Sequence, residues 1–192
     1  GKPTIINNVE TLSNVPGILR NGSDWFRSYG TEKSPGTKVF ALAGKIRNGG
    51  LVEVPMGITL GEIINDIGNG VSRKRTFKAV LTGGPSGGCL STKHLNEIVD
   101  FDNLVRLGSM MGSGGMIVLD DHDCMVDIAK FYLDFSVDES CGKCTPCREG
   151  TIQLYKLLDK ISKGEAHLKD LEKLRELANN VKESSLCGLG MT

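Results

Sequence analysis

Three cysteines lie within a run of seven residues, and this run constrains the chain more than any other feature. Cys141, Cys144 and Cys147 are spaced three positions apart, and Cys187 follows 40 positions later. The glycine and the proline inside the run favour turns over an uninterrupted helix, so the three thiols can converge on one point. A tetrahedral iron or zinc centre needs a fourth ligand, and Cys187 is the natural candidate.

Four cysteines of this kind suit an iron–sulfur cluster or a structural zinc ion. Zinc sites usually contain two Cys-x-x-Cys pairs, whereas a close triplet with one remote cysteine often holds a single [4Fe–4S] cubane. A second cubane is not expected, because Thr151 stands where a two-cluster ferredoxin run has its next cysteine. The six cysteines also allow a disulfide framework. The absence of a recognisable signal peptide disfavours it.

The composition excludes several classes of function. The chain has 23 basic and 23 acidic residues, so no net charge would recruit nucleic acid or an anionic membrane. No apolar run approaches the length of a membrane span, and we expect no direct membrane insertion. Cysteines placed as metal ligands favour a reducing compartment, so we expect a cytoplasmic protein.

The sequence predicts an α+β fold. The first residues indicate a strand end at Ile5 and Ile6, followed by a helix that Asn7 and Glu10 open as a capping box. We expect residues 16–17, Pro-Gly, to interrupt this helix. From residue 37 onward the pattern predicts a β-hairpin, a short helix and two further strands, at 38–46, 51–55, 60–67, 77–81 and 115–119. This order is typical of a β-grasp, or ubiquitin-like, domain.

Residues 122–192 predict helices. Apolar residues recur at helical spacing from Met125 onward, and again over 154–161 and 168–181 on either side of Gly164. The last two helices form a hairpin that can return Cys187 to the cysteine run.

Other conspicuous residues are given structural roles. The glycine-rich loops 83–88 and 112–115 match no phosphate-binding pattern and are expected to be close-packing turns. The acidic residues of 120–124 are explained by the helix that follows, so no metal site is expected there. We expect Cys124 to pack near the cluster without binding it, and Cys89 to be a small buried side chain.

Residues 139–150, Glu-Ser-Cys-Gly-Lys-Cys-Thr-Pro-Cys-Arg-Glu-Gly, resemble the ESCGxCxPCREG signature of a known family. Its members are the NADH-oxidising flavoprotein subunits of respiratory complex I and of related NAD(P)-linked hydrogenases. Residues 3–11 resemble the second hallmark of this family, and residues 83–89 are more similar to hydrogenase-type members. The resemblance implies an SLBB-type β-grasp domain followed by a helical bundle. It also implies that one [4Fe–4S] cluster is held by four cysteines, Cys141, Cys144, Cys147 and Cys187.

The resemblance further implies that this chain is a C-terminal fragment. The domain that binds FMN and NAD(P) would precede residue 1, and the helical bundle would continue beyond residue 192. Residues 1–36 would then be the tail end of that flavin-binding domain, 37–121 the β-grasp domain and 122–192 the helical bundle. Asn7 and Asn8 match family positions that touch FMN.

By resemblance, the whole protein oxidises or reduces NAD(P)(H) through FMN, and electrons pass through the cubane to iron–sulfur subunits of a hydrogenase or complex-I-like assembly. We assign no catalytic residue to this chain, because no nucleophile–base pair or cofactor loop is present. The cations Lys143 and Arg148 flank the ligands, and Arg148→Ala is expected to lower the cluster potential. The alternative is a non-redox adaptor, in which a β-grasp module binds a partner and zinc staples the helices.

Overall fold

The computed structural model describes residues 2–192 and contains one five-stranded mixed sheet in the order β2-β1-β5-β3-β4. Strands β1 and β2 form an antiparallel hairpin, β5 lies parallel to β1, and β3 pairs antiparallel with both β5 and β4. The strands are β1 (Thr37–Gly44), β2 (Gly50–Pro55), β3 (Phe77–Thr82), β4 (Gly88–Ser91) and β5 (Gly115–Asp120). The first hairpin and the strands after it were therefore predicted correctly, and β4 was missed.

One face of the sheet carries the hydrophobic core. In β1 the side chains of Phe40 and Leu42 are buried, whereas Ala41 between them is exposed, as strand alternation requires. The covering elements are η1 (Glu62–Ile67), η3 (Thr92–His94) and α3 (Phe101–Arg106). Thr59 caps the turn that leads into η1, because its hydroxyl accepts from the Glu62 amide and the Glu62 carboxylate accepts from the Thr59 amide.

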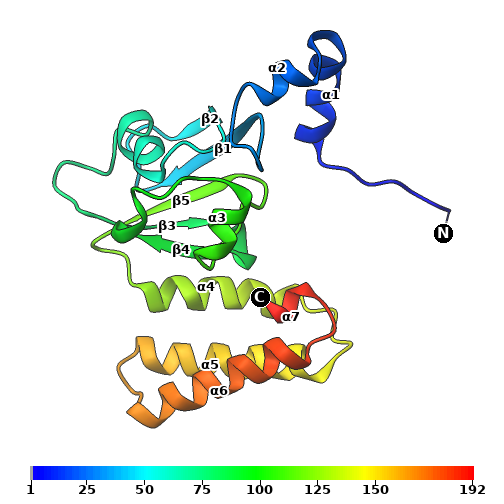
Figure 1. Cartoon of the computed structure of the whole chain (residues 1–192). Coiled ribbons are helices and arrows are strands. Elements are labelled where there is room, and N and C mark those ends of the chain that lie inside the picture. Colours follow the sequence, from blue (N-terminus) through cyan, green and yellow to red (C-terminus); the bar gives the residue numbers. More distant parts are fainter. Residues whose placement is uncertain (1) are drawn as a thin grey trace.

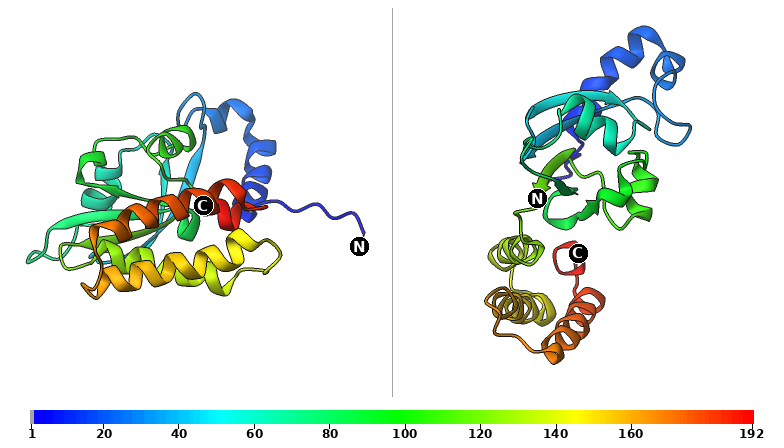
Figure 2. Two further views of the ribbon diagram at one scale, coloured as in Figure 1. Left: turned by 90° about the horizontal axis from the view of Figure 1, so that it is seen from below. Right: turned by 90° about the vertical axis from the view of Figure 1, so that its left-hand side faces the viewer.

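The C-terminal third is helical. Helix α4 lies between the sheet and a pair of helices, α5 and α6, as Figures 1 and 2 show. The elements are α4 (Met125–Asp138), η4 (Pro146–Gly150), α5 (Thr151–Ser162), α6 (Leu168–Ser184) and α7 (Gly188–Met191). Helix α5 packs against both α4 and α6, and Lys130 of α4 bonds Asp159 of α5 at 3.2 Å. No helix among residues 2–192 has the length and apolar content needed to cross a membrane.

The N-terminal segment differs from its prediction. Ile5 and Ile6 are exposed and belong to no strand. The helix α1 (Val9–Asn21) runs through Pro16, and α2 (Ser23–Arg27) follows it. The cap of α1 is Asn8, one residue later than expected, and its side chain accepts from the Glu10 amide at 2.9 Å. Continuation through a proline is possible because an exposed helix face loses only one backbone bond there.

Helix α1 is tied to the sheet by an ion pair. The Glu10 carboxylate bonds the Lys38 ammonium, and its other oxygen accepts from the Val39 amide at 2.7 Å. The Lys38 side chain is only 10% exposed, which makes this pair less screened than the surface pairs of the chain.

The glycine-rich loops are close-packing turns, as predicted. A Cβ at Gly87 would lie 1.6 Å from the carbonyl oxygen of Thr82, and one at Gly88 would lie 2.3 Å from that of Gly108. The first loop contains the short η2 (Gly84–Ser86) and leads directly into β4.

Candidate metal centre

The cysteine run begins just after α4 ends. Gly142 adopts φ +73°, a left-handed conformation that favours glycine, and so turns the chain back between the first two cysteines. A helix then starts around Pro146, which is acceptable in a first helical turn because its missing N–H would have no partner there. Cys147 is buried in this turn, Cys144 is half-buried and Cys141 is exposed.

The tail that contains Cys187 packs against this turn. Helices α6 and α7 both contact η4, and Figure 1 shows α7 beside the end of α4. The approach is close: a Cβ at Gly190 would lie 2.2 Å from Ser185 Oγ and 3.1 Å from the Cβ of Cys147. Only a glycine allows α7 to sit this near the buried thiol.

The polar groups of the tail and of the run face the thiols. The backbone amide of Leu186, followed by that of Cys147, lowers the pKa of the Cys144 thiol, because these N–H groups stabilise its thiolate. On the other side, Ser140 Oγ lies 3.4 Å from Cys147 Sγ and accepts from the Gly142 amide at 3.3 Å.

The Arg148 side chain forms a hydrogen bond with the backbone of the cysteine run. Arg148 donates to the Gly142 carbonyl oxygen at 2.6 Å and pairs with Glu149 at 3.1 Å. It therefore fastens the turn, and its charge is partly offset. The sequence prediction considered only the charge of this residue.

The Ser185 hydroxyl, in the tail beside the cysteine run, has no hydrogen-bond partner. Ser185 is 4% exposed, and its Oγ is buried without a hydrogen bond. It lies near enough to the Cys144 thiol to contribute to the lowered pKa, although the two groups lack hydrogen-bond geometry.

These residues fit an iron–sulfur group in the chemistry of their donors. The loop after α4 and the tail after α6 offer four thiols, two amides aimed at sulfur and an unused buried hydroxyl, which suits an electron-rich, sulfur-containing ligand. Among residues 2–192, no three Cys, His, Asp or Glu side chains are close enough together to hold a bare metal ion. The four-cysteine ligand set therefore stays a prediction.

Two other cysteines do not lie where the sequence suggested. Cys124 precedes α4 and is exposed, whereas the cysteine run follows the far end of this helix. A helix of 14 residues separates the two by about 21 Å, at 1.5 Å per residue, so Cys124 does not pack near the run.

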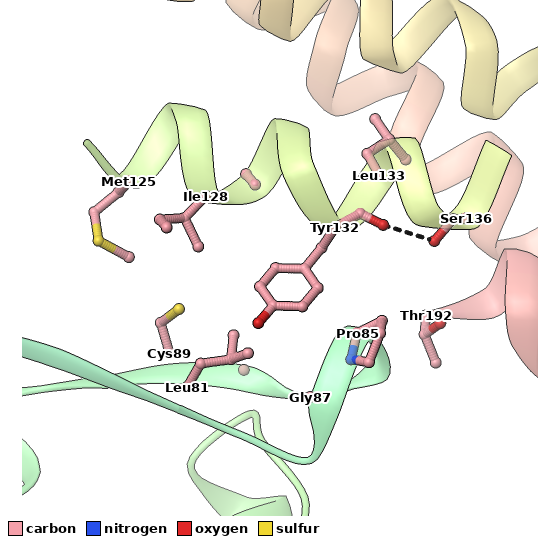
Figure 3. Close-up of a pocket in the computed structure, with 12 residues that line it drawn as sticks. Leu81, Pro85, Gly87, Cys89, Met125, Ile128, Tyr132, Leu133, Ser136 and Thr192 are labelled. Carbon is pink, nitrogen blue, oxygen red and sulfur yellow. Dashed lines mark hydrogen bonds between the residues drawn. The ribbon is translucent and has the colours of Figure 1, made fainter. Parts of the chain in front are cut away.

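Cys89 is likewise exposed rather than buried. It lines a cavity of about 370 Å³ between β4 and α4, together with Met125, Ile128 and Tyr132 (Figure 3). These neighbours raise the pKa of the Cys89 thiol by desolvation. The sequence could not predict the exposure of Cys89, because the exposure of one residue in a four-residue edge strand depends on what packs against that strand.

Asn7 and Asn8 lie far from the cysteines. Both are exposed on the N-terminal segment, which Figure 1 shows extending from the start of α1, away from α5 and α6. Asn7 Oδ1 accepts from the Asn8 amide at 2.9 Å, and Asn8 caps α1. Their predicted contact with FMN is not tested by these positions.

The sequence reasoning missed the hydroxyl groups of the site. Ser140 and Ser185 each stand two residues or fewer from a predicted ligand, and this proximity was the available signal. This signal is weak, because a serine that is close to a cysteine in the sequence faces the same site only if the turn between the two residues allows it.

Comparison with known proteins shows what this chain is similar to. Residues 127–192 match the family described as NADH-ubiquinone oxidoreductase-F iron-sulfur binding region. The C-terminal third of the chain is thus similar to this iron–sulfur binding region. It begins within α4 and includes all four predicted cysteine ligands.

Two curated proteins are similar to this chain over nearly its whole length. The NADP-reducing hydrogenase subunit HndC of Solidesulfovibrio fructosivorans is 58% identical over 191 residues, which are 100% of this chain and 39% of HndC. An NADH-quinone oxidoreductase subunit of Rhizobium meliloti is 46% identical over 98% of this chain and 45% of its own length. This chain thus spans about two-fifths of the curated relatives it matches.

A solved structure has the same fold. A chain in the crystal structure of an NAD⁺-reducing [NiFe]-hydrogenase in the H₂-reduced state is 36% identical, with a TM-score of 0.87. The match covers 99% of this chain and 32% of that chain. The likeness therefore includes both the mixed sheet and the helices after it.

Proposed function

We propose that this chain carries electrons through one [4Fe–4S] cluster bound by Cys141, Cys144, Cys147 and Cys187. The observation that carries this proposal is the packing of α7 and the Cys187 tail against the turn that contains Cys147. Segments 40 positions apart in the sequence meet there, and a thiol from each side is available.

When bound, such a cluster accepts and releases one electron at a time. The chain's own residues set the conditions for this transfer. The amides of Leu186 and Cys147 stabilise negative charge on the Cys144 sulfur. Burial of Cys147 keeps water away from one side of the site, and Arg148 holds the turn through the Gly142 carbonyl.

For the whole protein we propose a flavoprotein component of a larger assembly that oxidises or reduces NAD(P)(H) through FMN. The names of the relatives support this, since one is an NADP-reducing hydrogenase subunit and another an NADH-quinone oxidoreductase subunit. The NAD(P)(H) chemistry belongs to the whole protein, and Asn7 and Asn8 are its proposed FMN contacts here. Further iron–sulfur subunits are the proposed partners, and the cytoplasm is the proposed location.

We also propose the domain division made from the sequence, with a β-grasp domain over 37–121 and a helical bundle over 122–192. The hairpin β1–β2, the following η1 and the insertion of β5 parallel to β1 support the first assignment. The packing of α5 against both α4 and α6 supports the second.

Iron, acid-labile sulfide and zinc content of anaerobically purified protein, followed by EPR after dithionite reduction, tests the cluster. We expect about four irons and four sulfides per chain and a reduced-cubane signal. Cys147→Ser is expected to abolish the signal, and Cys124→Ser serves as the matched control, because Cys124 lies at the other end of α4. One zinc without sulfide would favour the adaptor function instead.

A further inference from the structure

Ser185 terminates α6 immediately before the tail that contains Cys187. Its amide donates to the Val181 carbonyl at 3.0 Å, as the last bond of the helix, and its extended backbone then directs the chain toward the cysteine run. The residue is 4% exposed, yet its hydroxyl has no hydrogen-bond partner. Buried hydroxyl groups are nearly always bonded, so an unused one at this position calls for a partner.

The position of this hydroxyl is close to the cysteine run. Ser185 Oγ lies 2.2 Å from the position that a Cβ of Gly190 would take, and the same position is 3.1 Å from Cys147 Cβ. The hydroxyl thus lies beside Cys147, a predicted cluster ligand, in space that Gly190 leaves open. Its contribution to lowering the pKa of the Cys144 thiol agrees with this position.

The neighbouring hydroxyls are already engaged. Thr151 donates to the Cys147 carbonyl at 2.6 Å, and Ser184 donates to the Asn180 carbonyl. Ser140 accepts from the Gly142 amide and contacts Cys147 Sγ. Ser185 is the one buried side chain among residues 2–192 whose polar atom is left without a partner.

We propose that the Ser185 hydroxyl donates a hydrogen bond to a sulfur of the bound cluster, either the Cys144 thiolate or an adjacent inorganic sulfide, and thereby raises its reduction potential. Ser185 is a positioning residue that transfers no proton, and no covalent bond changes. Reduction adds one negative charge, so a donor to sulfur stabilises the reduced state more than the oxidised one. This inference rests on the proposed cluster.

The test is a dithionite titration of the holoprotein monitored by EPR, with Ser185→Ala and the matched control Ser184→Ala. Loss of the hydrogen bond is expected to reduce the ratio of reduced to oxidised cluster about tenfold at a given potential, a shift of about 59 mV downward for a one-electron couple. Ser184→Ala should leave the potential unchanged, because its hydroxyl bonds within α6. Equal potentials for all three proteins would overturn the inference.

The two proposals fail in different ways. Absence of iron and sulfide from the wild-type protein would contradict the cluster itself, whereas clusters of equal potential in wild type and Ser185→Ala would contradict only the role of Ser185. Ser185→Thr keeps the hydroxyl and is expected to restore the wild-type potential.

A second measurement applies if Ser185→Ala does not retain a cluster. Wild type and Ser185→Thr, both produced with serine deuterated at Cβ, are compared by deuterium ENDOR of the reduced cluster. Labelled Ser140 contributes deuteron couplings in both proteins, and we expect an additional coupling in wild type that is missing from Ser185→Thr, because only wild type has a labelled side chain at position 185. Identical spectra would place Ser185 away from the cluster and overturn the inference.

Discussion

Gly190→Ala tests whether close packing of α7 on the cysteine run is needed for the site. The added methyl would lie 2.2 Å from Ser185 Oγ, 2.7 Å from Ser185 Cβ and 3.1 Å from Cys147 Cβ, and ordinary contacts begin near 3.4 Å. Rotation of the serine hydroxyl relieves only the first clash. The remaining two involve Cβ atoms fixed to the backbone, so α7 must move outward.

The free-energy cost of Gly190→Ala can be estimated from the usual cost of overpacking. Additional methyl groups in well-packed sites typically cost about 1–3 kcal/mol. This corresponds to a roughly five- to 150-fold shift toward the state in which the tail is detached. We therefore expect faster loss of iron to a chelator, and fewer irons per chain after reconstitution.

Gly188→Ala is the matched control for this variant. Gly188 lies in the same short helix, but a Cβ there would meet no atom within 4 Å. Alanine favours helix over glycine by roughly 0.5–1 kcal/mol, so this variant should retain its iron as well as wild type does or slightly better. If both variants lose iron at the same rate as wild type, the tail does not need to approach the run this closely, and the packing argument is wrong.

Three further predictions concern other contacts. Glu10→Gln is expected to lower the free energy of unfolding by about 2 kcal/mol in a urea titration, because it leaves the nearly buried Lys38 without its counter-charge; a change below about 0.5 kcal/mol would contradict this. The pKa of Asp159 lies below its ordinary value because of bonds to Lys163, which follows α5, and to Lys130 of α4. Its stabilising contribution is therefore present above the pKa of the unfolded chain and is lost as the pH falls through the folded pKa. Asp159→Asn should flatten the acid side of a stability–pH profile, and an unchanged profile would exclude this role. Arg148→Ala is expected to lower the cluster potential and also to speed cluster loss, since the guanidinium holds the Gly142 carbonyl; a change in potential without a change in loss rate would show that its charge alone matters.

The helices of the C-terminal third could be predicted from sequence because their apolar residues repeat at helical spacing. Leu154, Leu157 and Val181 are buried along α5 and α6, as that spacing requires. Strand β4 was missed for the opposite reason. Its four residues include a glycine and a serine, so alternation is too short to detect, and pairing with β3 determines its conformation.

The meeting of the cysteine run with the Cys187 tail was predictable from the sequence, whereas the groups around the thiols were not. The cysteine pattern indicated which segments meet. It gave no information on which hydroxyls and amides face the sulfurs, because those directions depend on how α6 ends and how α7 packs. The positions of Cys89 and Cys124 were misjudged on similar grounds, since burial of a single thiol is decided by tertiary neighbours.

The α5–α6 hairpin has a consequence for how the site is assembled. Cys147 and Cys187 stand at its two ends, 40 positions apart. Bringing together the ends of a flexible loop of that length costs roughly 3 kcal/mol of chain entropy. Here the hairpin closes through its own packing and through the bond between Lys160 and Asp170 at 2.7 Å. The folded chain therefore holds both segments together in advance, and for the proposed cluster, substitutions that loosen the hairpin should weaken iron retention without touching any cysteine.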